Sequence, residues 1–129
     1  MTAKDIQRFA KISTANLKLK AQKLFNAWIR KRDEGQPCIA CGKFTVLQAG
    51  HFKSAGTYNH LRFEPDNVHG QCLRCNYYLQ QSDTKYRENL IEKIGQERVE
   101  KLDFLAKIPG PHKTDRFRLI EVILKYGAK

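Results

Sequence analysis

The sequence predicts a small α+β fold, because three patterns occur along its 129 residues. Apolar residues recur at steps of three and four in the first and last thirds of the chain, which indicates amphipathic helices. A run rich in β-forming residues lies between them at 44–51. Two Cys-x2-Cys pairs flank this run and predict a structural metal site. A chain of this length is expected to form a single domain.

The charge of the chain is strongly positive and unevenly spread. Lys and Arg number 24 against 13 Asp and Glu, which gives a formal net charge of +11. Residues 1–32 hold nine of the basic side chains and a single acidic one. This excess favours a polyanionic partner, above all a nucleic acid. Acidic proteins and anionic membrane surfaces are the open alternatives.

The predicted domain has three segments. The first, 1–33, is a basic arm with an amphipathic helix from Thr14 to about Arg32. The second, 34–82, is the metal-bound core, and the third, 83–129, supplies helices that pack on it. We expect five basic residues of the first helix to contact DNA phosphates: Lys18, Lys20, Lys23, Arg30 and Lys31. A solvated helix face is the alternative reading of these charges.

The chain lacks the features of a membrane or secreted protein. No apolar run reaches the roughly 18 to 20 residues that a bilayer span needs. Residues 1–10 lack the apolar stretch of a secretory signal. We therefore expect a soluble, cytoplasmic protein without a membrane partner. In that reducing compartment, paired cysteines bind metal in preference to forming disulfides.

The cysteine spacing predicts a structural zinc site. The two pairs stand thirty residues apart and comprise Cys38, Cys41, Cys72 and Cys75. Four soft thiolates enclose one tetrahedral Zn²⁺ with no open position, so such a site stabilises a fold and performs no chemistry. The long span between the pairs favours a treble-clef arrangement. Free thiols, two disulfides, or a mixed site with His51 or His69 are the alternatives.

The β-forming run from Phe44 to His51 suggests a short hairpin whose second arm presents His51. Residues 53–60 have the composition of an exposed loop. The second cysteine pair is expected to run into a short helix. Three further helices should follow: one capped by Asp83 or Thr84 and ending at Gly95, one over 96–107, and one over 114–126.

Three polar residues stand between and just beyond the cysteine pairs: His51 in Ala-Gly-His-Phe, Asn67 in Pro-Asp-Asn-Val-His, and Asn76 in Cys-Leu-Arg-Cys-Asn-Tyr. This set resembles the active site of the HNH nuclease superfamily in its His-Asn-Asn, ββα-metal form. The resemblance implies that His51 is the general base, that Asn67 fixes the active-site backbone, and that Asn76 binds a catalytic divalent cation. A neutral imidazole suits proton abstraction near pH 7, and an amide oxygen suits Mg²⁺ or Mn²⁺. A structural histidine and a turn asparagine are the plainer alternatives.

The chain departs from this superfamily at one position. Many members carry Asp or His as a further metal ligand just before the base, where this chain has Gly50. That departure leaves Asn76 as the sole protein ligand, with His69 as a spare candidate for the cation, a phosphate or the zinc layer. We expect three more basic residues to meet phosphates, with solvated surface charge as the alternative: Lys53, Arg62 and Arg74.

A longer series of motifs runs over about residues 20–126 and includes Phe25-Asn-Ala-Trp-Ile-Arg-Lys-Arg-Asp, Pro37-Cys-Ile-Ala-Cys-Gly, Leu61-Arg-Phe, Asn67-Val-His-Gly-Gln-Cys and Tyr86-Arg-Glu-Asn-Leu. This series resembles the phage lambda NinG (Rap) recombination proteins. The resemblance implies a divalent-cation-dependent DNA endonuclease that acts on branched recombination intermediates, such as Holliday junctions and D-loops. It also implies a phage or prophage protein in a bacterial host. We do not expect the long, cysteine-containing N-terminal extension of the phage protein here.

Two other classes of function compete with an endonuclease. One is a non-catalytic, zinc-containing DNA-binding protein that assists recombination, and the absence of acidic ligands favours it. The other is a zinc-stapled protein-interaction domain. For the endonuclease, symmetrical resolution of a four-way junction needs paired cuts, so a homodimer is a mechanistic expectation.

Overall fold

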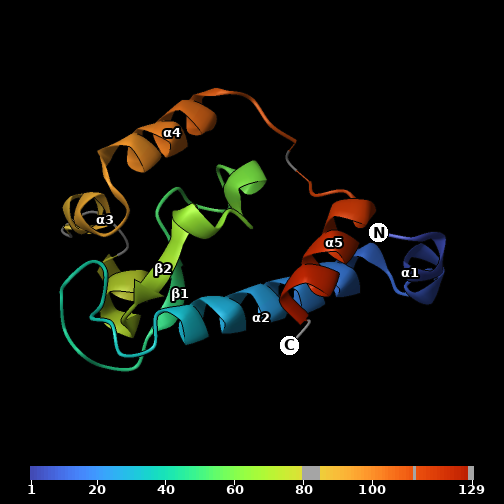
Figure 1. Cartoon of the computed structure of the whole chain (residues 1–129), viewed down its shortest axis with the longest axis horizontal. Coiled ribbons are helices and arrows are strands. Elements are labelled where there is room, and N and C mark those ends of the chain that lie inside the picture. Colours follow the sequence, from blue (N-terminus) through green and yellow to red (C-terminus); the bar gives the residue numbers. More distant parts are fainter. Residues whose placement is uncertain (80–84, 112, 128–129) are drawn as a thin grey trace.

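The computed structural model describes residues 1–79, 85–111 and 113–127, and it confirms an α+β fold (Figure 1). Its helices are α1 (Ala3–Arg8), α2 (Thr14–Arg32), α3 (Tyr86–Ile94), α4 (Gln96–Lys107) and α5 (Arg116–Gly127). Its strands are β1 (Gln48–His51) and β2 (Val68–Gln71). Shorter turns are η1 (Asn59–Leu61), η2 (Pro65–Asn67) and the π-helical η3 (Arg74–Leu79).

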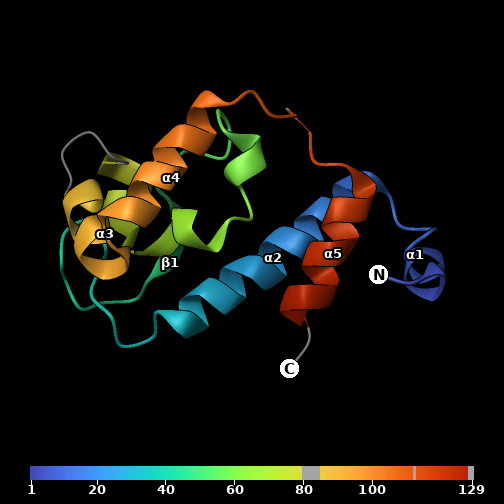
Figure 2. The ribbon, with the colours of Figure 1, turned by 45° about the horizontal axis from the view of Figure 1, so that its top comes forward.

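Helix α2 forms over the predicted residues and builds the first hydrophobic core. The Ser13 hydroxyl accepts a hydrogen bond from the amide of Asn16 and so caps the helix. The buried face of α2 packs against α5, and both views show the two helices side by side (Figures 1 and 2). Phe9 and Phe63 complete this core. The apolar faces of α2 and α5 therefore cover each other.

The predicted hairpin is wrong in its pairing. Strand β1 pairs antiparallel with β2, so that Gly50 lies opposite His69, and residues 44–47 form no strand. Phe44 is exposed there, so it has no buried sheet face to join. Strand β2 is buried throughout and also accepts a hydrogen bond from the amide of Ile39 at the carbonyl of Gly70. Strand β1 therefore pairs with β2, which lies further along the chain, and not with residues 44–47.

A second hydrophobic core surrounds the cysteines. It contains Cys38, Ile39, Ala40, Phe52, Cys72, Cys75, Tyr86, Leu90, Val99 and Leu102. The two-stranded sheet touches both cores, because Val68 belongs to the first and Phe52, which follows β1 directly, belongs to the second. Helices α3 and α4 pack at the cysteine end, away from α2 and α5 (Figure 1). The sheet thus lies where the two cores meet.

The later helices agree with the sequence in position. Helix α4 spans Gln96–Lys107, and α5 begins at Arg116, two residues after the predicted start. Helix α3 begins at Tyr86, and its predicted caps, Asp83 and Thr84, lie outside the described residues. The short helix α1, which Thr2 caps, was not predicted. Within the described ranges, no helix is long and apolar enough to cross a membrane.

Candidate metal centre and active site

The four cysteines come together at the end of the sheet. Their sulfur atoms all lie within 4.8 Å of one another, and the sulfurs of Cys41 and Cys72 are 3.7 Å apart. Sulfurs at the corners of a tetrahedron about 2.3 Å from a zinc ion are about 3.8 Å apart. All four thiols are free of disulfides, and no histidine joins the cluster among the described residues. The set fits a four-cysteine zinc site and does not fit the mixed site.

The protonation of these thiols explains why a cation is needed. Burial raises the pKa of Cys75, and the nearby thiols raise it further. Burial alone would also raise the pKa of Cys38, but backbone N–H groups of Cys72, Cys41 and Ala40 lower it to about 7. Cys38 is therefore the readiest thiolate. Four sulfur anions at this spacing require a positive charge between them, which a bound Zn²⁺ would supply.

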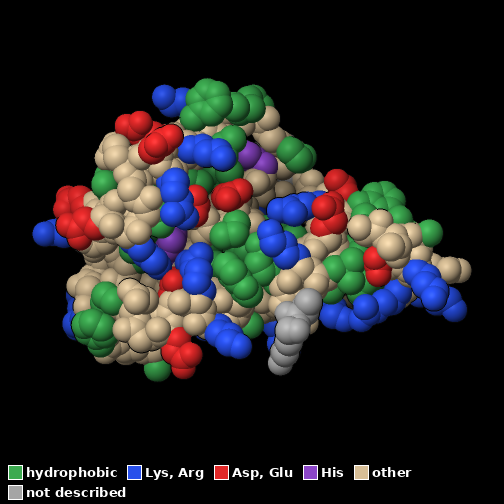
Figure 3. Space-filling view, in the orientation of Figure 1, with side chains coloured by type: hydrophobic (Ala, Val, Ile, Leu, Met, Phe, Trp, Pro, Cys, Tyr) green, Lys and Arg blue, Asp and Glu red, His purple; other side chains and the backbone are tan. Residues whose placement is uncertain are grey.

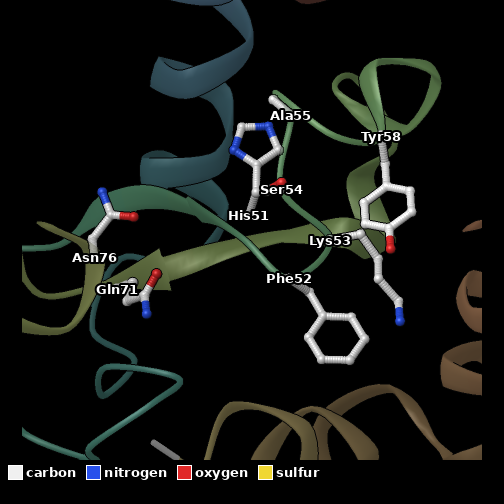
Figure 4. Close-up of a pocket in the computed structure, with 8 residues that line it drawn as sticks. All are labelled: His51, Phe52, Lys53, Ser54, Ala55, Tyr58, Gln71 and Asn76. Atoms are coloured by element: carbon white, nitrogen blue, oxygen red, sulfur yellow. The ribbon is translucent and has the colours of Figure 1, made fainter. Parts of the chain in front are cut away.

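His51 lies at the end of β1 and lines a pocket of about 530 Å³ (Figure 4). Its Nε2 donates a hydrogen bond to the carbonyl oxygen of Arg62 at 3.0 Å. In the neutral ring this bond keeps the proton on Nε2 and the lone pair on Nδ1. Burial lowers the pKa of His51, the Arg62 carbonyl opposes this, and the Arg62 guanidinium lowers it again. At pH 7 the ring is a neutral base.

Asn67 is fully buried and fixes the backbone that follows His51. Its Oδ1 accepts a hydrogen bond from the amide of Lys53 at 2.8 Å. Its Nδ2 donates to the carbonyls of Lys53 and Leu61, at 3.0 and 3.1 Å. The amide of Phe52 donates to the carbonyl of Asn67. These bonds join η2 to Lys53 and Leu61, which follow His51 along the chain. Asn67 therefore holds the loop after His51 in place and does not line the pocket.

Asn76 lines the same pocket as His51. It lies in η3, whose first turn is set by the hydrogen bond from its amide to the carbonyl of Cys72. Its Nδ2 donates to Oε1 of Gln48 at 3.0 Å. Figure 4 shows Asn76 and Gln71 at one end of the pocket and Lys53 with Tyr58 at the other. Strand β1 and the short helix η3 therefore bring His51 and Asn76 to one pocket beside the cysteine cluster.

His69 does not belong to this pocket. It is 1% exposed, its Nε2 donates to the carbonyl of Asp66 at 2.8 Å, and its Nδ1 lies 2.9 Å from Nζ of Lys93. Nη2 of Arg32 approaches the same Nδ1 at 3.1 Å. Both ring nitrogens are thus engaged within the protein. The spare role for His69 at the cation is wrong in this geometry, because the ring serves the packing of α2, β2 and α3.

The three basic residues predicted near the phosphates differ in their surroundings. Lys53 lines the pocket, and its Nζ forms an ion pair with Asp103 at 2.9 Å. The guanidinium of Arg62 donates to Asn59 and Gln22. Arg74 lies beside a different, more apolar hollow of about 780 Å³ next to the cysteines. Of the three, only Lys53 reaches the pocket of His51.

The predicted basic residues of α2 lie on its outward side. Lys20, Lys23, Arg30 and Lys31 are exposed, and Lys18 is half-buried. Figure 3 shows basic side chains along the edge of the molecule over α1 and the first half of α2. This edge lies at the opposite end of the molecule from the cysteines (Figure 1). A polyanion that reached both regions would span the length of α2.

Sequence reasoning missed two amides beside the pocket, Gln71 and Gln48. Gln71 lines the pocket and Gln48 holds Asn76. A glutamine in a four-residue strand carries no sequence signal of a functional role. The predicted hairpin also paired β1 with the wrong segment, so it did not place Gln48 opposite Gln71. Only the register of the sheet brings these residues to the site.

Comparisons with known proteins agree on one family. The family model described as Bacteriophage Lambda NinG protein matches residues 2–129. Protein ninG of Escherichia phage lambda is 42% identical over 85 residues, which are 64% of this chain and 42% of that protein. Protein ninG of Salmonella phage P22 is 41% identical over 99 residues, 75% of this chain and 46% of that protein. The chain thus spans less than half the length of these curated relatives. No solved structure matches it.

Proposed function

Because the chain belongs to the bacteriophage lambda NinG family, we propose that it is a metal-dependent endonuclease that hydrolyses phosphodiester bonds in branched DNA. The observation that carries this proposal is the pocket of His51. A neutral histidine of fixed tautomer shares that pocket with the amide of Asn76, beside a thiol cluster that suits structural zinc. This combination supplies a base and a cation ligand at one position.

The reaction follows from the ring of His51. Nδ1 takes a proton from a water molecule, and the water oxygen forms a bond to the phosphorus of the scissile phosphate. The bond from phosphorus to the 3′ oxygen then breaks, the 3′ oxygen takes a proton from solvent, and His51 returns its proton to solvent, which leaves a 5′-phosphate and a 3′-hydroxyl. The carbonyl of Arg62 steadies the ring while it gains charge, since Nε2 donates to it throughout. Asn67 keeps the loop that begins at Phe52 from shifting the base.

The end of the pocket that holds Asn76 offers a ligand that suits a divalent cation. Amide oxygens are hard ligands of the kind that Mg²⁺ and Mn²⁺ accept, and Asn76 presents one on a short helix. When bound, the cation would stabilise negative charge on the phosphate and the leaving oxygen. Lys53 contributes a positive charge at the opposite wall, although Asp103 offsets part of it.

Branched DNA as the substrate rests on the resemblance to the NinG proteins together with the charge of the chain. Its formal net charge of +11 and the exposed lysines of α2 support phosphate binding that is independent of sequence. Contacts to phosphates carry no sequence information, so binding of this kind is compatible with selection of DNA by its shape. We include a homodimer in the proposal, because a four-way junction is resolved by two cuts.

Substitution of His51 tests the proposal. We expect His51→Ala to lower Mg²⁺-dependent cleavage of a four-way junction by roughly 10² to 10⁴. Zinc content and DNA binding should be unchanged. His60→Ala is the matched control, because Nε2 of His60 also lies 2.9 Å from a backbone carbonyl, that of Leu105, but His60 does not line the pocket. Unchanged cleavage in His51→Ala would reject the assignment.

A non-catalytic DNA-binding protein is the second candidate. The observation that favours it is that no Asp or Glu lines the pocket among the residues that the structure describes. Incubation of the pure protein with linear, supercoiled and four-way-junction DNA, with and without Mg²⁺ or Mn²⁺, separates the two. Binding without any cation-dependent cleavage would favour the accessory role.

A further inference from the structure

Exposed apolar side chains gather beside the cysteine cluster. Val46, Leu73 and Tyr78 are each more than half exposed and line the hollow of about 780 Å³ next to the cysteines, which we call the aromatic hollow. The ring of Tyr77, which is also exposed, contacts that of Tyr78, with centroids 5.1 Å apart. Apolar side chains that group at a surface in this way mark a site where a partner binds.

The aromatic hollow is larger than the metal site at its floor. Cys41, Cys72 and Cys75 form part of its lining, and a zinc ion between their sulfurs would fill only that part. The rest of the lining comes from residues within 43–48 and 73–78. The volume lies in the range of roughly 300 to 1,000 Å³ that is usual for sites of small organic ligands. The hollow therefore has room for an organic ring above the metal.

The charges at the aromatic hollow favour an anionic partner. Lys43 and Arg74 line it and are exposed, and no Asp or Glu lines it among the described residues. A cationic ligand is therefore disfavoured, and a purely apolar ligand would gain nothing from the two charges. Aromatic rings beside basic side chains are the combination that binds single-stranded nucleic acids, because bases stack on the rings while Lys and Arg meet the phosphates.

The aromatic hollow adjoins the pocket of His51. Gln48 lines the hollow, Asn76 lines the pocket, and their two side-chain amides share a hydrogen bond of 3.0 Å. The short helix η3 carries Arg74 and Tyr78 at the hollow and Asn76 at the pocket. A base held in the hollow would therefore belong to a nucleotide close to a phosphate in the pocket.

We propose that the aromatic hollow binds an unpaired base of the DNA strand whose phosphate enters the pocket of His51. This inference rests on the proposed function and deepens it. The base would stack on Tyr78, and Tyr77 would extend the aromatic surface. In an intact duplex the bases are stacked on one another, so only an unpaired base can enter the hollow. Displaced strands and opened branch points supply such bases, which gives branched DNA a physical advantage over a linear duplex.

The test compares binding of a single strand with binding of a duplex. Fluorescence anisotropy of labelled oligo(dT), and of a linear duplex of the same length, is measured with the zinc-loaded full chain at one salt concentration and without added Mg²⁺. We expect Tyr78→Ala to weaken binding of the single strand by roughly 5- to 100-fold and to leave duplex binding unchanged, because the stack of one base is lost. Tyr78→Phe keeps the ring and should bind as the wild type does. Phe104→Ala is the matched control, since Phe104 is also an exposed aromatic residue but lies on α4 and lines neither site.

A photochemical measurement needs no substitution. The wild-type chain is irradiated with a single strand that contains 5-iodouracil, which forms a covalent link to an aromatic ring stacked on it, and mass spectrometry identifies the linked residue. We expect the link at Tyr77 or Tyr78. This readout decides the matter if Tyr78→Ala loses zinc or melts early. Links only to other aromatic residues, such as Trp28 or Phe104, would overturn the inference.

The outcomes separate this inference from the proposed function. If Tyr78→Ala binds the single strand as the wild type does while His51→Ala loses junction cleavage, the hollow holds no base and the proposed function stands. If Tyr78→Ala loses single-strand binding but the wild type cuts no DNA, the proposed function fails, and the base site then supports the non-catalytic candidate. If Tyr78→Ala lowers self-association and leaves single-strand binding unchanged, the hollow is a contact between copies of the chain and the inference is overturned.

Discussion

The proton on His51 is placed by a single backbone contact. A carbonyl oxygen only accepts hydrogen bonds, so the 3.0 Å approach of Nε2 to the carbonyl of Arg62 fixes the proton on that nitrogen. The same contact keeps Nδ1 as the basic atom. Asn67 adds a second constraint through the backbone of Lys53. The orientation and the protonation of the His51 ring are thus set by a backbone carbonyl and a buried amide.

This arrangement predicts the pH dependence of cleavage. Burial lowers the pKa of His51 below its usual 6.5, so the neutral ring persists to lower pH than in a free histidine. The rate should be constant near pH 7 and fall as the pH drops through the lowered pKa, because the ring then becomes protonated. The measurement is kcat/KM for junction cleavage against pH at fixed Mg²⁺. An acid limb centred above pH 6.5 would contradict the assigned environment of His51.

Among the elements, α2, β2 and α3 are tied by one buried polar group of residues. Asp33 accepts hydrogen bonds from the amide of Gly70 at 2.7 Å and from Arg32, and Lys93 lies 3.0 Å from it. Burial would raise the pKa of Asp33, but these donors hold it well below its usual range. His69 completes the group through Lys93 and Arg32. Three elements therefore share one buried contact in which Asp33 meets two cationic side chains.

The group predicts a loss of stability in acid. Burial, together with the ammonium of Lys93, lowers the pKa of His69 to about 4. Between about pH 6.5 and 4 the unfolded chain binds more protons than the folded chain at this residue, so the free energy of unfolding falls as the pH falls. The loss is at most about 3 kcal/mol. Urea unfolding of zinc-loaded wild type, His69→Gln and the control His60→Gln should show a flatter pH dependence for His69→Gln alone.

Elements were predictable from the sequence where their signal is local. The period of apolar residues identified α2, α4 and α5, because a helix face is set by residues three and four apart. Strand pairing is not local. The β-forming composition of 44–47 indicated extended backbone, but β1 found its partner in Val68–Gln71, beyond an intervening loop. Cysteine spacing predicted the cysteine cluster, whereas the position of Gln71 at the pocket depends on that unpredicted register.

At the scale of the whole molecule, the sheet couples the metal centre to the helical core. Val68 lies in the core of α2 and α5, and Cys72 directly follows the same strand. Trp28 contacts Tyr126 in the helical core, with ring centroids 5.1 Å apart. Loss of zinc should therefore disturb residues that touch no cysteine.

Zinc removal tests this coupling. We expect Cys72→Ser to lose zinc and to unfold at a lower temperature, because a structural zinc contributes folding free energy directly. The fluorescence of Trp28 should change in the same transition as the far-ultraviolet circular dichroism. A variant that keeps both its metal and its melting temperature would contradict the structural role of the site. A Trp28 signal that is unaffected by zinc loss would show that the two cores unfold independently.

The exposed basic residues of α2 predict how DNA binding depends on salt. Each phosphate contact that is lost should lower the slope of log K against log salt by about 0.9. Joint replacement of Lys20, Lys23 and Arg30 by Gln should therefore weaken binding to all DNA shapes and flatten that slope. Lys101, Lys107 and Lys113, also exposed, give a control with the same change of charge. An α2 triple variant whose slope equals that of the wild type would contradict phosphate contacts by these three residues.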